Sequence, residues 1–455
     1  MEGLTDALCE RIAALRYEDL GPDTVARVKD AIGDGLSVAV DGSTEKPVAI
    51  LADYVRSLES APRSTVWGYG FKSSAASAAL VNAASAHVLD YEPMSSPSTH
   101  AVSPVMPVAF ALAEVRDCSG RDIVTACAKG FEMQHRLLYA GKLPPRSDRR
   151  FHQVGMVGGM GAAVAAAHLL GLDAKGLRAT LGIAASRAGS LLGNGGTMTK
   201  CAHAGYAASG GLEAALLAER GFSGNARIME HGQGYAAAFL GGDSLDRARL
   251  LDFGKPFRVV DPGMAYKFFP SKYPTQFAIT GALELHEKIK DPSRIARIRM
   301  ITPLMPDVDR PQPATGLEGK FSFQYCVAAA LLDGEVGKDS FSDERRFAAD
   351  LVALLPKFEI AQTSEIPLEF TQMRIELEVE MQDGTRHRTV CSKPKGFWGV
   401  AIEPAEHLKK MRDCMSGRVG DAEIKQCYET VTRLEQIDVA GVRKLVQLLG
   451  KTSSG

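Results

Sequence analysis

The sequence predicts a mainly α-helical protein, with a large helical-bundle domain and a smaller α+β domain. Between residue 3 and about residue 250, apolar residues recur at helical spacing in one Ala- and Leu-rich segment after another, with Gly at the joins. The alternation of strands and helices that is typical of a parallel βαβ fold does not occur there. After Lys255, prolines interrupt the chain and strand-like alternation begins. A chain of 455 residues has room for both domains.

The first part of the chain supplies the helices of the bundle. Small residues recur often enough in these segments to let helices approach one another closely. The segments that we expect to be helical are 23–40, 73–90, 104–114, 121–138, 155–170, 177–185 and 204–219.

The second domain is predicted from strand signals. In 375–381 apolar and charged residues alternate, Asp383-Gly384 supplies a turn, and 386–390 returns as the second strand of a hairpin. Another strand is expected over 294–302, and helices over 324–332 and 343–354. Helical character returns after Glu406. We therefore expect a helical domain over 1–264, an α+β domain over 265–402, and a return to the helical domain over 403–455, which makes that domain discontinuous.

Charge and cysteine usage narrow the function classes. With 53 Lys and Arg against 54 Asp and Glu, the formal net charge is −1, so no global field attracts nucleic acid or an anionic membrane. The eight cysteines are scattered and show no zinc-ligand spacing. The sequence has no signal-peptide pattern at its start and no apolar run of membrane-spanning length. These observations predict a cytoplasmic protein that binds neither nucleic acid nor membrane.

Residues 87–107 hold the most informative candidate site. A helix delivers Asp90 near its end, a loop with two prolines follows, and His100 precedes a new helix. In a functional interpretation, His100 is an acid or base and Asp90 orients it or holds a substrate hydroxyl. In a structural interpretation, Asp90 is a solvated helix end and His100 neighbours a helix cap. The residues alone favour the structural interpretation.

Two glycine-rich segments follow, and neither is a nucleotide site. The glycines after His152 do not follow a strand, so they predict close helix packing with His152 at a helix N-terminus, where the dipole lowers an imidazole pKa and favours anions. The segment 193–200 lacks Walker A spacing. It delivers Lys200 to the start of a helix with His203 one turn further on, a suitable corner for a carboxylate.

The domain junction and one later helix complete the candidates. Lys267 and Lys272 stand beside aromatic residues and prolines, where they either place cations in a cleft or are ordinary surface lysines on a linker. Tyr325 opens an Ala-rich helix and would by itself be assigned to the core.

At these positions the sequence resembles the MmgE/PrpD family, which includes 2-methylcitrate dehydratase, iminodisuccinate epimerase and cis-aconitate decarboxylase. Each matching block is weak alone, but together they follow the family order over nearly the whole chain. The blocks are Ala86-His-Val-Leu-Asp90-Tyr, His100 with the later Pro-Val-Met-Pro-Val-Ala, Ser119-Gly120-Arg121-Asp122, Phe151-His152 before Gly161-Ala-Ala, Gly196-Thr-Met-Thr-Lys200, Tyr266-Lys267 with Pro270, and Ser322-Phe-Gln-Tyr325.

The resemblance implies a fold and a set of roles. The fold is a discontinuous helical domain with an α+β lid, usually in a homodimer. The implied catalysis needs no metal and no organic cofactor: the enzyme removes a proton next to a carboxylate. The implied pocket contains His100 or His152 as base and acid, Asp90 orienting one of them, Lys200 and Lys267 binding carboxylates, and Tyr325 as a donor, with His203, Met94 and Lys272 lining it.

Departures from the family pattern guide the choice of reaction. Lys272 stands where decarboxylase-like members have His, and Met94 where many members have a small hydroxyl residue. Tyr91-Glu92-Pro93 replaces an acidic pair. These departures disfavour decarboxylation, and the apolar Met94 and the additional cation Lys272 allow a substrate that differs from both methylcitrate and iminodisuccinate. The first expectation is a lyase that dehydrates a 2-methylcitrate-like di- or tricarboxylate. The alternative is an epimerase of the iminodisuccinate type. A cis-aconitate-type decarboxylase and a non-catalytic carboxylate-binding protein are less favoured.

Overall fold

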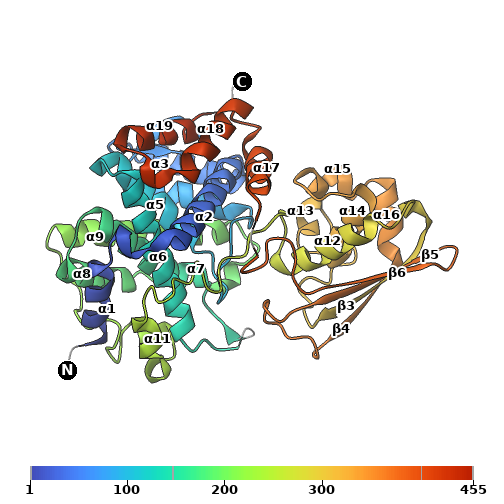
Figure 1. The fold of residues 1–455 in the computed structure, drawn as a ribbon, viewed down its shortest axis with the longest axis horizontal. Helices are drawn as coiled ribbons and strands as arrows, with labels where there is room; N and C mark the ends of the chain where they lie inside the picture. Colours follow the sequence, from blue (N-terminus) through green and yellow to red (C-terminus); the bar gives the residue numbers. More distant parts are fainter. Residues whose placement is uncertain (1–2, 146–147, 401, 453–455) are drawn as a thin grey trace. The chain divides into compact units, whose positions relative to one another are not determined.

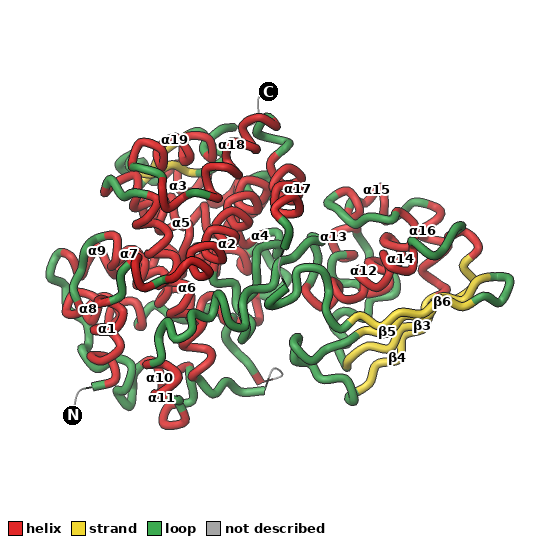
Figure 2. Tube along the Cα trace, in the orientation of Figure 1, coloured by secondary structure: helices red, strands yellow, loops and turns green. Residues whose placement is uncertain are grey.

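A computed structural model describes residues 3–145, 148–400 and 402–452. The chain forms two compact units, one of residues 1–265 and 401–455 and the other of residues 266–400. The first unit is almost entirely helical and the second combines helices with a sheet (Figures 1 and 2). The predicted fold class, mainly α with a smaller α+β part, is confirmed.

The first unit is a helical bundle with one short hairpin. Helix α7 lies at its centre, in contact with α5, α6, α8 and α9. The elements are α1 (Leu4–Ala14), α2 (Gly21–Gly42), α3 (Lys46–Ser57), β1 (Ser64–Val66), β2 (Phe71–Ser73), α4 (Ala75–Val88), α5 (Val102–Arg116), α6 (Gly120–Ala140), α7 (Gln153–Leu169), α8 (Ala174–Ala185), α9 (Thr199–Glu219), α10 (Tyr235–Phe239), α11 (Arg247–Leu251), α17 (Pro404–Met415), α18 (Asp421–Thr432) and α19 (Val439–Leu449).

Local sequence signals explain where several of these helices begin. Ser119 accepts a hydrogen bond from the Asp122 N–H, and the Asp122 side chain accepts one from the Ser119 N–H, so a capping box opens α6. At the start of α8, the Asp173 side chain accepts a single capping hydrogen bond from the N–H of Gly176. The predicted helices are therefore present, mostly extended by one to five residues. The β1–β2 hairpin was not predicted, because strands of three residues leave little periodicity to detect.

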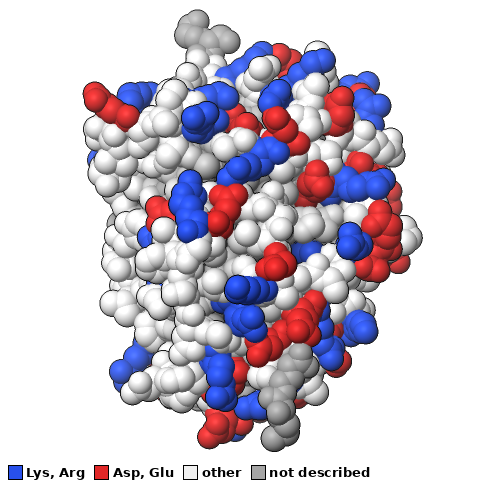
Figure 3. Space-filling model, turned by 90° about the vertical axis from the view of Figure 1, so that its left-hand side faces the viewer, with Lys and Arg blue, Asp and Glu red and all other residues white. Residues whose placement is uncertain are grey.

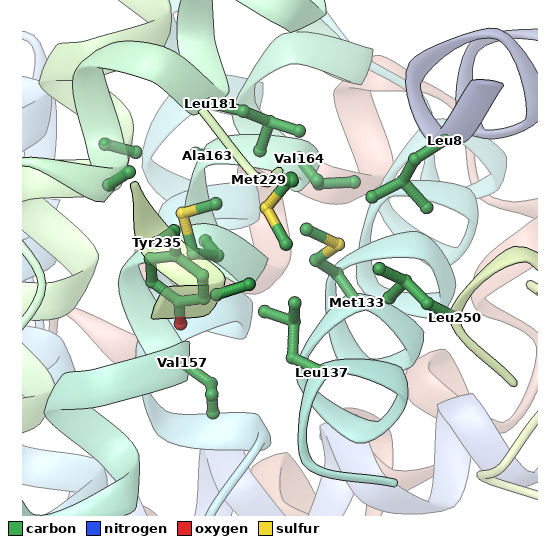
Figure 4. Packing of buried hydrophobic residues seen from close by; sticks show 14 of the residues in the cluster. Leu8, Met133, Leu137, Val157, Ala163, Val164, Leu181, Met229, Tyr235 and Leu250 are labelled. Atoms are coloured by element: carbon green, nitrogen blue, oxygen red, sulfur yellow. The ribbon is translucent and has the colours of Figure 1, made fainter. Parts of the chain in front are cut away.

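The centre of the first unit is a tightly packed apolar core. Met133 and Leu137 of α6 meet Val157 and Val164 of α7, and Leu8 of α1 packs beside them (Figure 4). All five side chains are buried. Burying each such side chain stabilises the fold by about 1.5–3 kcal/mol. This core fixes α7 relative to α6, and α7 carries a histidine at each end.

Glycine in α7 allows the close helix contacts that the sequence predicted. A Cβ on Gly161 would lie 2.5 Å from the carbonyl oxygen of Gly130 in α6 and 2.7 Å from Cγ of Gln134. Both distances are shorter than van der Waals contact. A larger residue would push the two helices apart, so the packing interpretation of this glycine-rich segment is confirmed.

The C-terminal helices of the first unit pack on its N-terminal part, with α17 and α18 against α2. Lys410 of α17 is buried, and its Nζ lies 2.7 Å from Oδ2 of Asp34 in α2. The same Nζ donates a hydrogen bond of 3.0 Å to the carbonyl oxygen of Tyr91, which follows Asp90 in the chain. The C-terminal segment therefore anchors the loop after α4.

The second unit is a four-stranded mixed sheet with helices. The strand order is β4-β3-β5-β6; β3 pairs parallel with β4 and antiparallel with β5, and β5 pairs antiparallel with β6. Helix α12 packs on β5 and β6. The elements are α12 (Tyr273–His286), β3 (Ile295–Pro303), α13 (Gly316–Gly319), α14 (Phe323–Asp333), α15 (Asp343–Arg346), α16 (Ala349–Leu354), β4 (Phe358–Thr363), β5 (Ile375–Met381) and β6 (Arg386–Cys391).

The predicted hairpin and the strand over 294–302 are present, but one predicted helix is wrong. The segment 343–354 forms two short helices, because Ala348 has an extended conformation between them. The break lets Arg345 pair with both Asp333 and Asp350, while the buried Arg346 donates to the carbonyl oxygen of Pro313. Helix α12 and strand β4 were not predicted.

The distribution of surface charge and the apolar character of the helices can be compared with the prediction that the protein binds neither nucleic acid nor membrane. On the face drawn in Figure 3, basic and acidic side chains are interspersed and neither sign forms a continuous patch, in keeping with the formal charge of −1. Among the described helices, none combines the length and the apolar character that crossing a bilayer requires.

Candidate active site

Helix ends and one loop of the first unit carry the candidate catalytic side chains. Asp90 follows α4 with a φ of 53°, a left-handed conformation that Asp tolerates better than most residues. His100 lies just before α5. His152 is the residue that precedes α7, and its N–H donates to the carbonyl oxygen of Ser190 at 2.9 Å. Lys200 is in the first turn of α9.

Asp90 lies between two basic groups. Its Oδ1 is 3.3 Å from Nε2 of His100 and 3.4 Å from Nζ of Lys200. The side chains of Asp90 and Lys200 keep 19% and 28% of their exposure, whereas that of Glu92 in the same loop keeps none. Solvent, and therefore a ligand, reaches this group of residues from the side of Asp90 and Lys200.

Four imidazoles form a row beside this ion pair. The ring centroids of His100 and His87 are 5.0 Å apart, those of His87 and His152 are 5.5 Å apart, and those of His152 and His203 are 5.2 Å apart. The row therefore joins α4, the loop before α5, the start of α7 and α9. We call these rings together with Asp90, Glu92 and Lys200 the imidazole cluster.

His152 and His203 are held in the neutral state. Their Nδ1 atoms are 3.1 Å apart, so one must donate a proton and the other must offer a lone pair. Burial, together with the nearby His87, Lys200, His100 and His203, lowers the pKa of His152 to about 2. Burial and Lys200 also lower the pKa of His203. A neutral imidazole can accept a proton, which is what a base requires.

Glu92 is a central member of the cluster that the sequence interpretation missed. Its Oε1 lies 2.6 Å from Nδ1 of His87 and 3.5 Å from Nδ1 of His100. Its Oε2 accepts a hydrogen bond of 2.9 Å from the N–H of Ser103 in α5. Glu92 and His87 are fully buried. Asp90 and Glu92 therefore place a carboxylate oxygen within 3.5 Å of each of the two ring nitrogens of His100.

Two further residues define the surroundings of the cluster. Met94 is buried and pairs its backbone with Ala265, its N–H donating at 2.7 Å. Ser95 Oγ lies 2.5 Å from Nε2 of His135, whose pKa burial lowers to about 3. Met94 therefore presents an apolar side chain close to Asp90 in the chain, where a hydroxyl residue would offer a hydrogen bond.

Lys267, Lys272 and Tyr325 belong to the second unit. Lys267 is fully buried. Lys272 precedes α12 and forms an ion pair with Asp307. Tyr325 is buried in α14, its hydroxyl donates to the carbonyl oxygen of Ser340 at 2.5 Å, and burial raises its pKa to about 12. Their roles at a substrate site stay predictions.

His87, Glu92 and His100 are also the one group of potential metal ligands among the described residues, with donor atoms within 4.8 Å of one another. Two histidines and a carboxylate are suitable ligands for a transition-metal ion. The separation of 2.6 Å between Glu92 and His87, however, has the length of a charge-assisted hydrogen bond. Catalysis without a metal stays a prediction, and chelation tests it.

Comparisons with known proteins extend over both units. Residues 6–248 match the family model described as the MmgE/PrpD N-terminal domain, and residues 269–436 match the MmgE/PrpD C-terminal domain. The chain is 29% identical to cis-aconitate decarboxylase of Mus musculus, with 97% of this chain and 93% of the relative covered. It is 28% identical to cis-aconitate decarboxylase of Homo sapiens, with 97% and 94% covered. It is 24% identical to cis-aconitate decarboxylase of Aspergillus terreus, with 98% and 96% covered.

Proposed function

Because the chain belongs to the MmgE/PrpD family, we propose that it is a lyase that transfers a proton at the carbon next to a carboxylate of a small polycarboxylic acid. The observation that carries this proposal is the imidazole cluster itself. One ring, His152, is neutral, and another, His100, has a carboxylate at each nitrogen. A base and an acid are thus provided within one row of side chains.

The proposed roles follow from these states. His152 accepts the proton from the substrate carbon, and His100 donates a proton to the departing group. Lys200, which is partly exposed, binds the carboxylate where negative charge grows as the proton leaves. Asp90 and Glu92 hold His100 from its two sides and act as positioning residues.

Substrate binding would tune the base. Three of the causes that lower the pKa of His152 are the neighbouring His87, Lys200 and His100. A bound di- or tricarboxylate beside Lys200 brings negative charge that offsets their effect. The pKa of His152 then rises toward the working pH, where an imidazole is an effective base.

The first candidate reaction is dehydration of a 2-methylcitrate-like hydroxy acid. His152 takes the proton from carbon, the carbon–oxygen bond breaks as the double bond forms, and the hydroxide leaves as water with the proton of His100. The neutral state of His152 supports a reaction that begins with proton removal. Met94 and Lys272, which depart from the family pattern, support a substrate different from that of a decarboxylase.

The second candidate is decarboxylation of a cis-aconitate-like acid, and the relatives favour it. Proteins named cis-aconitate decarboxylase match almost the full length of this chain. In that reaction the substrate loses CO2 and His100 protonates the carbanion that remains. Epimerisation, in which a proton returns to the opposite face, is the third outcome that the same groups allow.

One experiment separates these reactions. Purified protein is incubated with citrate-type hydroxy acids, with cis-aconitate and with imino dicarboxylates in deuterium oxide, and the products are followed by NMR and by CO2 release. A new alkene from a hydroxy acid supports dehydration, CO2 supports decarboxylation, and deuterium wash-in without elimination supports epimerisation. An inert protein would refute the enzymatic proposal and favour a carboxylate-binding protein. A homodimer is also expected, and analytical ultracentrifugation tests it.

A further inference from the structure

The first unit contains a cavity that the proposed reaction does not use. It has a volume of about 420 Å³ and is lined by residues from the end of α1, from α6 and from α7 and the loop after it. Ile12, Val164 and Leu177 form an apolar floor, and each is at most 2% exposed. Arg16, Arg121 and Lys129 contribute cations to its wall. We call it the α6–α7 cavity.

Lys129 is the unusual residue of this cavity. It is only 2% exposed, and its Nζ lies 3.2 Å from Nδ1 of His168 in α7. Among the described residues, no carboxylate forms an ion pair with Lys129, although the negative charge of Asp19 raises the pKa of its ammonium group. Buried lysines are rare unless they are paired. An ammonium group in this position therefore retains donors for an anion.

The charge states of the two buried bases favour an anion as well. Burial, with a contribution from Arg16, lowers the pKa of Lys129 to about 8, so this side chain is still mainly protonated at neutral pH. Burial lowers the pKa of His168 to about 4, so the imidazole is neutral. The pair thus consists of a charged donor held by a neutral acceptor.

The acidic residues around the cavity have partners of their own. Asp122 accepts hydrogen bonds from the N–H and the hydroxyl of Ser119 in the capping box of α6. Glu18 lies 3.4 Å from Arg121, and Asp19 accepts a hydrogen bond from the backbone N–H of Arg16. The guanidinium of Arg16 forms no ion pair with any described carboxylate. Lys129 and Arg16 are therefore the two cations that an anion would meet.

We propose that the α6–α7 cavity is a second ligand site, which binds a small oxyanion, a carboxylate or a phosphate, between Lys129 and Arg16. Arg16 presents a planar pair of donors that suits two oxygens of such a group, and the Lys129 ammonium supplies a third contact. The apolar floor accepts a short hydrocarbon part of the ligand. The volume is within the range of about 300–1,000 Å³ that is usual for small-molecule sites.

The site is separate from the imidazole cluster. His152 precedes the first residue of α7, and His168 lies in its last turn. Sixteen residues at about 1.5 Å each place them about 24 Å apart. An anion bound beside His168 cannot contact Lys200 or Asp90, so binding there does not compete with substrate.

Titration with two probes tests the proposal, with inorganic phosphate and succinate as the probes. The thermal midpoint and isothermal titration calorimetry are measured for the wild type, Arg16→Gln, Lys129→Met and a control, Lys175→Gln, which removes the same charge from an exposed position on α8. We expect saturable binding of at least one probe by the wild type and the control, a five- to tenfold weaker Kd, roughly, in Arg16→Gln, and loss of binding in Lys129→Met. The probe that binds identifies the source of the oxyanion.

A further variant separates this site from the candidate active site. Lys200→Gln should keep the binding that Arg16→Gln weakens, whether or not the proposed reaction is correct. Binding that is lost in Lys200→Gln but intact in Arg16→Gln would place the anion in the imidazole cluster and overturn the proposal. No saturable binding of either probe by the wild type would overturn it as well. If Lys129→Met does not fold, the exposed Arg16 position decides the outcome.

Discussion

Each end of α7 has a histidine close to a lysine, but the two ends differ in whether carboxylates lie beside the pair. At its start, His152 stands in a row of imidazoles with Lys200, and the carboxylates of Asp90 and Glu92 lie among them. At its end, His168 faces Lys129 and no carboxylate is bonded to the pair in the described chain. The start of α7 combines an acid, a base and carboxylates, the groups that proton transfer uses, whereas its end offers a cation and a neutral acceptor, which suit the binding of an anion. The difference explains why we assign catalysis to one end and anion binding to the other.

The largest effect that separates the two ends is expected from histidine substitutions. His100→Ala should lower kcat/KM by about a hundred- to ten-thousand-fold, because it removes the proposed acid. His168→Gln, at the other end of α7, should leave kcat/KM within a factor of about two, since it touches no group proposed to react. Circular dichroism checks that both variants fold. Equal losses of activity in the two variants would contradict the assignment of catalysis to the His152 end of α7 alone.

Two buried lysines offer the next test, through the free energy of unfolding. Lys410→Met leaves the buried carboxylate of Asp34 without its partner, and it should lower the free energy of unfolding by about 3–5 kcal/mol. Lys129→Met leaves no carboxylate behind, and its free energy of unfolding should stay within about 1 kcal/mol of the wild type or rise above it. Urea denaturation measures both. A large loss in Lys129→Met would mean that an unnoticed anionic partner stabilises this lysine.

A substitution of Glu92 tests whether a carboxylate in the imidazole cluster contributes to the proposed reaction. Glu92→Gln keeps the shape but replaces one acceptor oxygen by a donor, so His87 or the N–H of Ser103 loses its acceptor. We expect kcat to fall by about ten- to a hundredfold while KM changes little. Glu114→Gln, at a carboxylate that binds Thr65 instead, is the matched control and should keep its activity. A Glu92→Gln protein with normal kcat would assign this carboxylate to stability alone.

The pH dependence of stability is a smaller effect that both ends share. In the folded state the pKa is about 2 for His152 and about 4 for His168, against an ordinary value of 6.5. Below pH 6.5 these two histidines take up protons in the unfolded chain but not in the folded chain. Their contribution to the free energy of unfolding is therefore complete above pH 6.5 and decreases as the pH falls from 6.5 toward the pKa of the folded state. Each contributes a slope of about 1.4 kcal/mol per pH unit in its window. His168→Gln should reduce the slope between pH 6 and pH 4.5, measured by urea denaturation; an unchanged slope would contradict the neutral imidazole at this end.

The smallest expected effect concerns metal removal. If protons rather than an ion connect His87, Glu92 and His100, dialysis against EDTA leaves kcat/KM unchanged. The assay is repeated after addition of Zn²⁺ or Mn²⁺. Activity that disappears with EDTA and returns with either ion would make the cluster a metal site.

Much of the fold follows from local sequence signals. The helices of the first unit are long segments rich in Ala and Leu, and the 375–390 hairpin has a clear alternation of apolar and charged residues. Capping residues such as Ser119 mark the starts of some helices. The short β1–β2 hairpin and the break at Ala348 depend on tertiary contacts, including those of Arg345 and Arg346, and such contacts leave no periodic signal. For that reason these two features were absent from the prediction.

In the candidate site, too, some residues have a local sequence signal and others are recognised only through tertiary contacts. Asp90, His100, His152, Lys200 and His203 were selected separately from loops and helix starts, and the structure brings them together in the first unit. His87 and Glu92 were not selected, because a histidine inside an Ala-rich helix and a glutamate before a proline are ordinary in isolation. Only the folded arrangement of α4 and the following loop brings His87 and Glu92 close to His100. In the sequence, the signal for this arrangement is limited to the spacing of five residues between His87 and the acidic Glu92. Lys129 was hidden in the same way, inside a regular helix.

Solvent-deuterium incorporation reports directly whether the imidazole cluster moves a proton at the substrate carbon. Wild-type protein, His100→Ala and His152→Ala are incubated in deuterium oxide with the polycarboxylic acid that gives turnover, and deuterium at the carbon next to the carboxylate is measured by NMR in substrate and product. We predict that the wild type exchanges or transfers a proton at that carbon and that both variants lose the activity while remaining folded. Incorporation at the wild-type rate in both variants would show that the imidazole cluster does not move the proton.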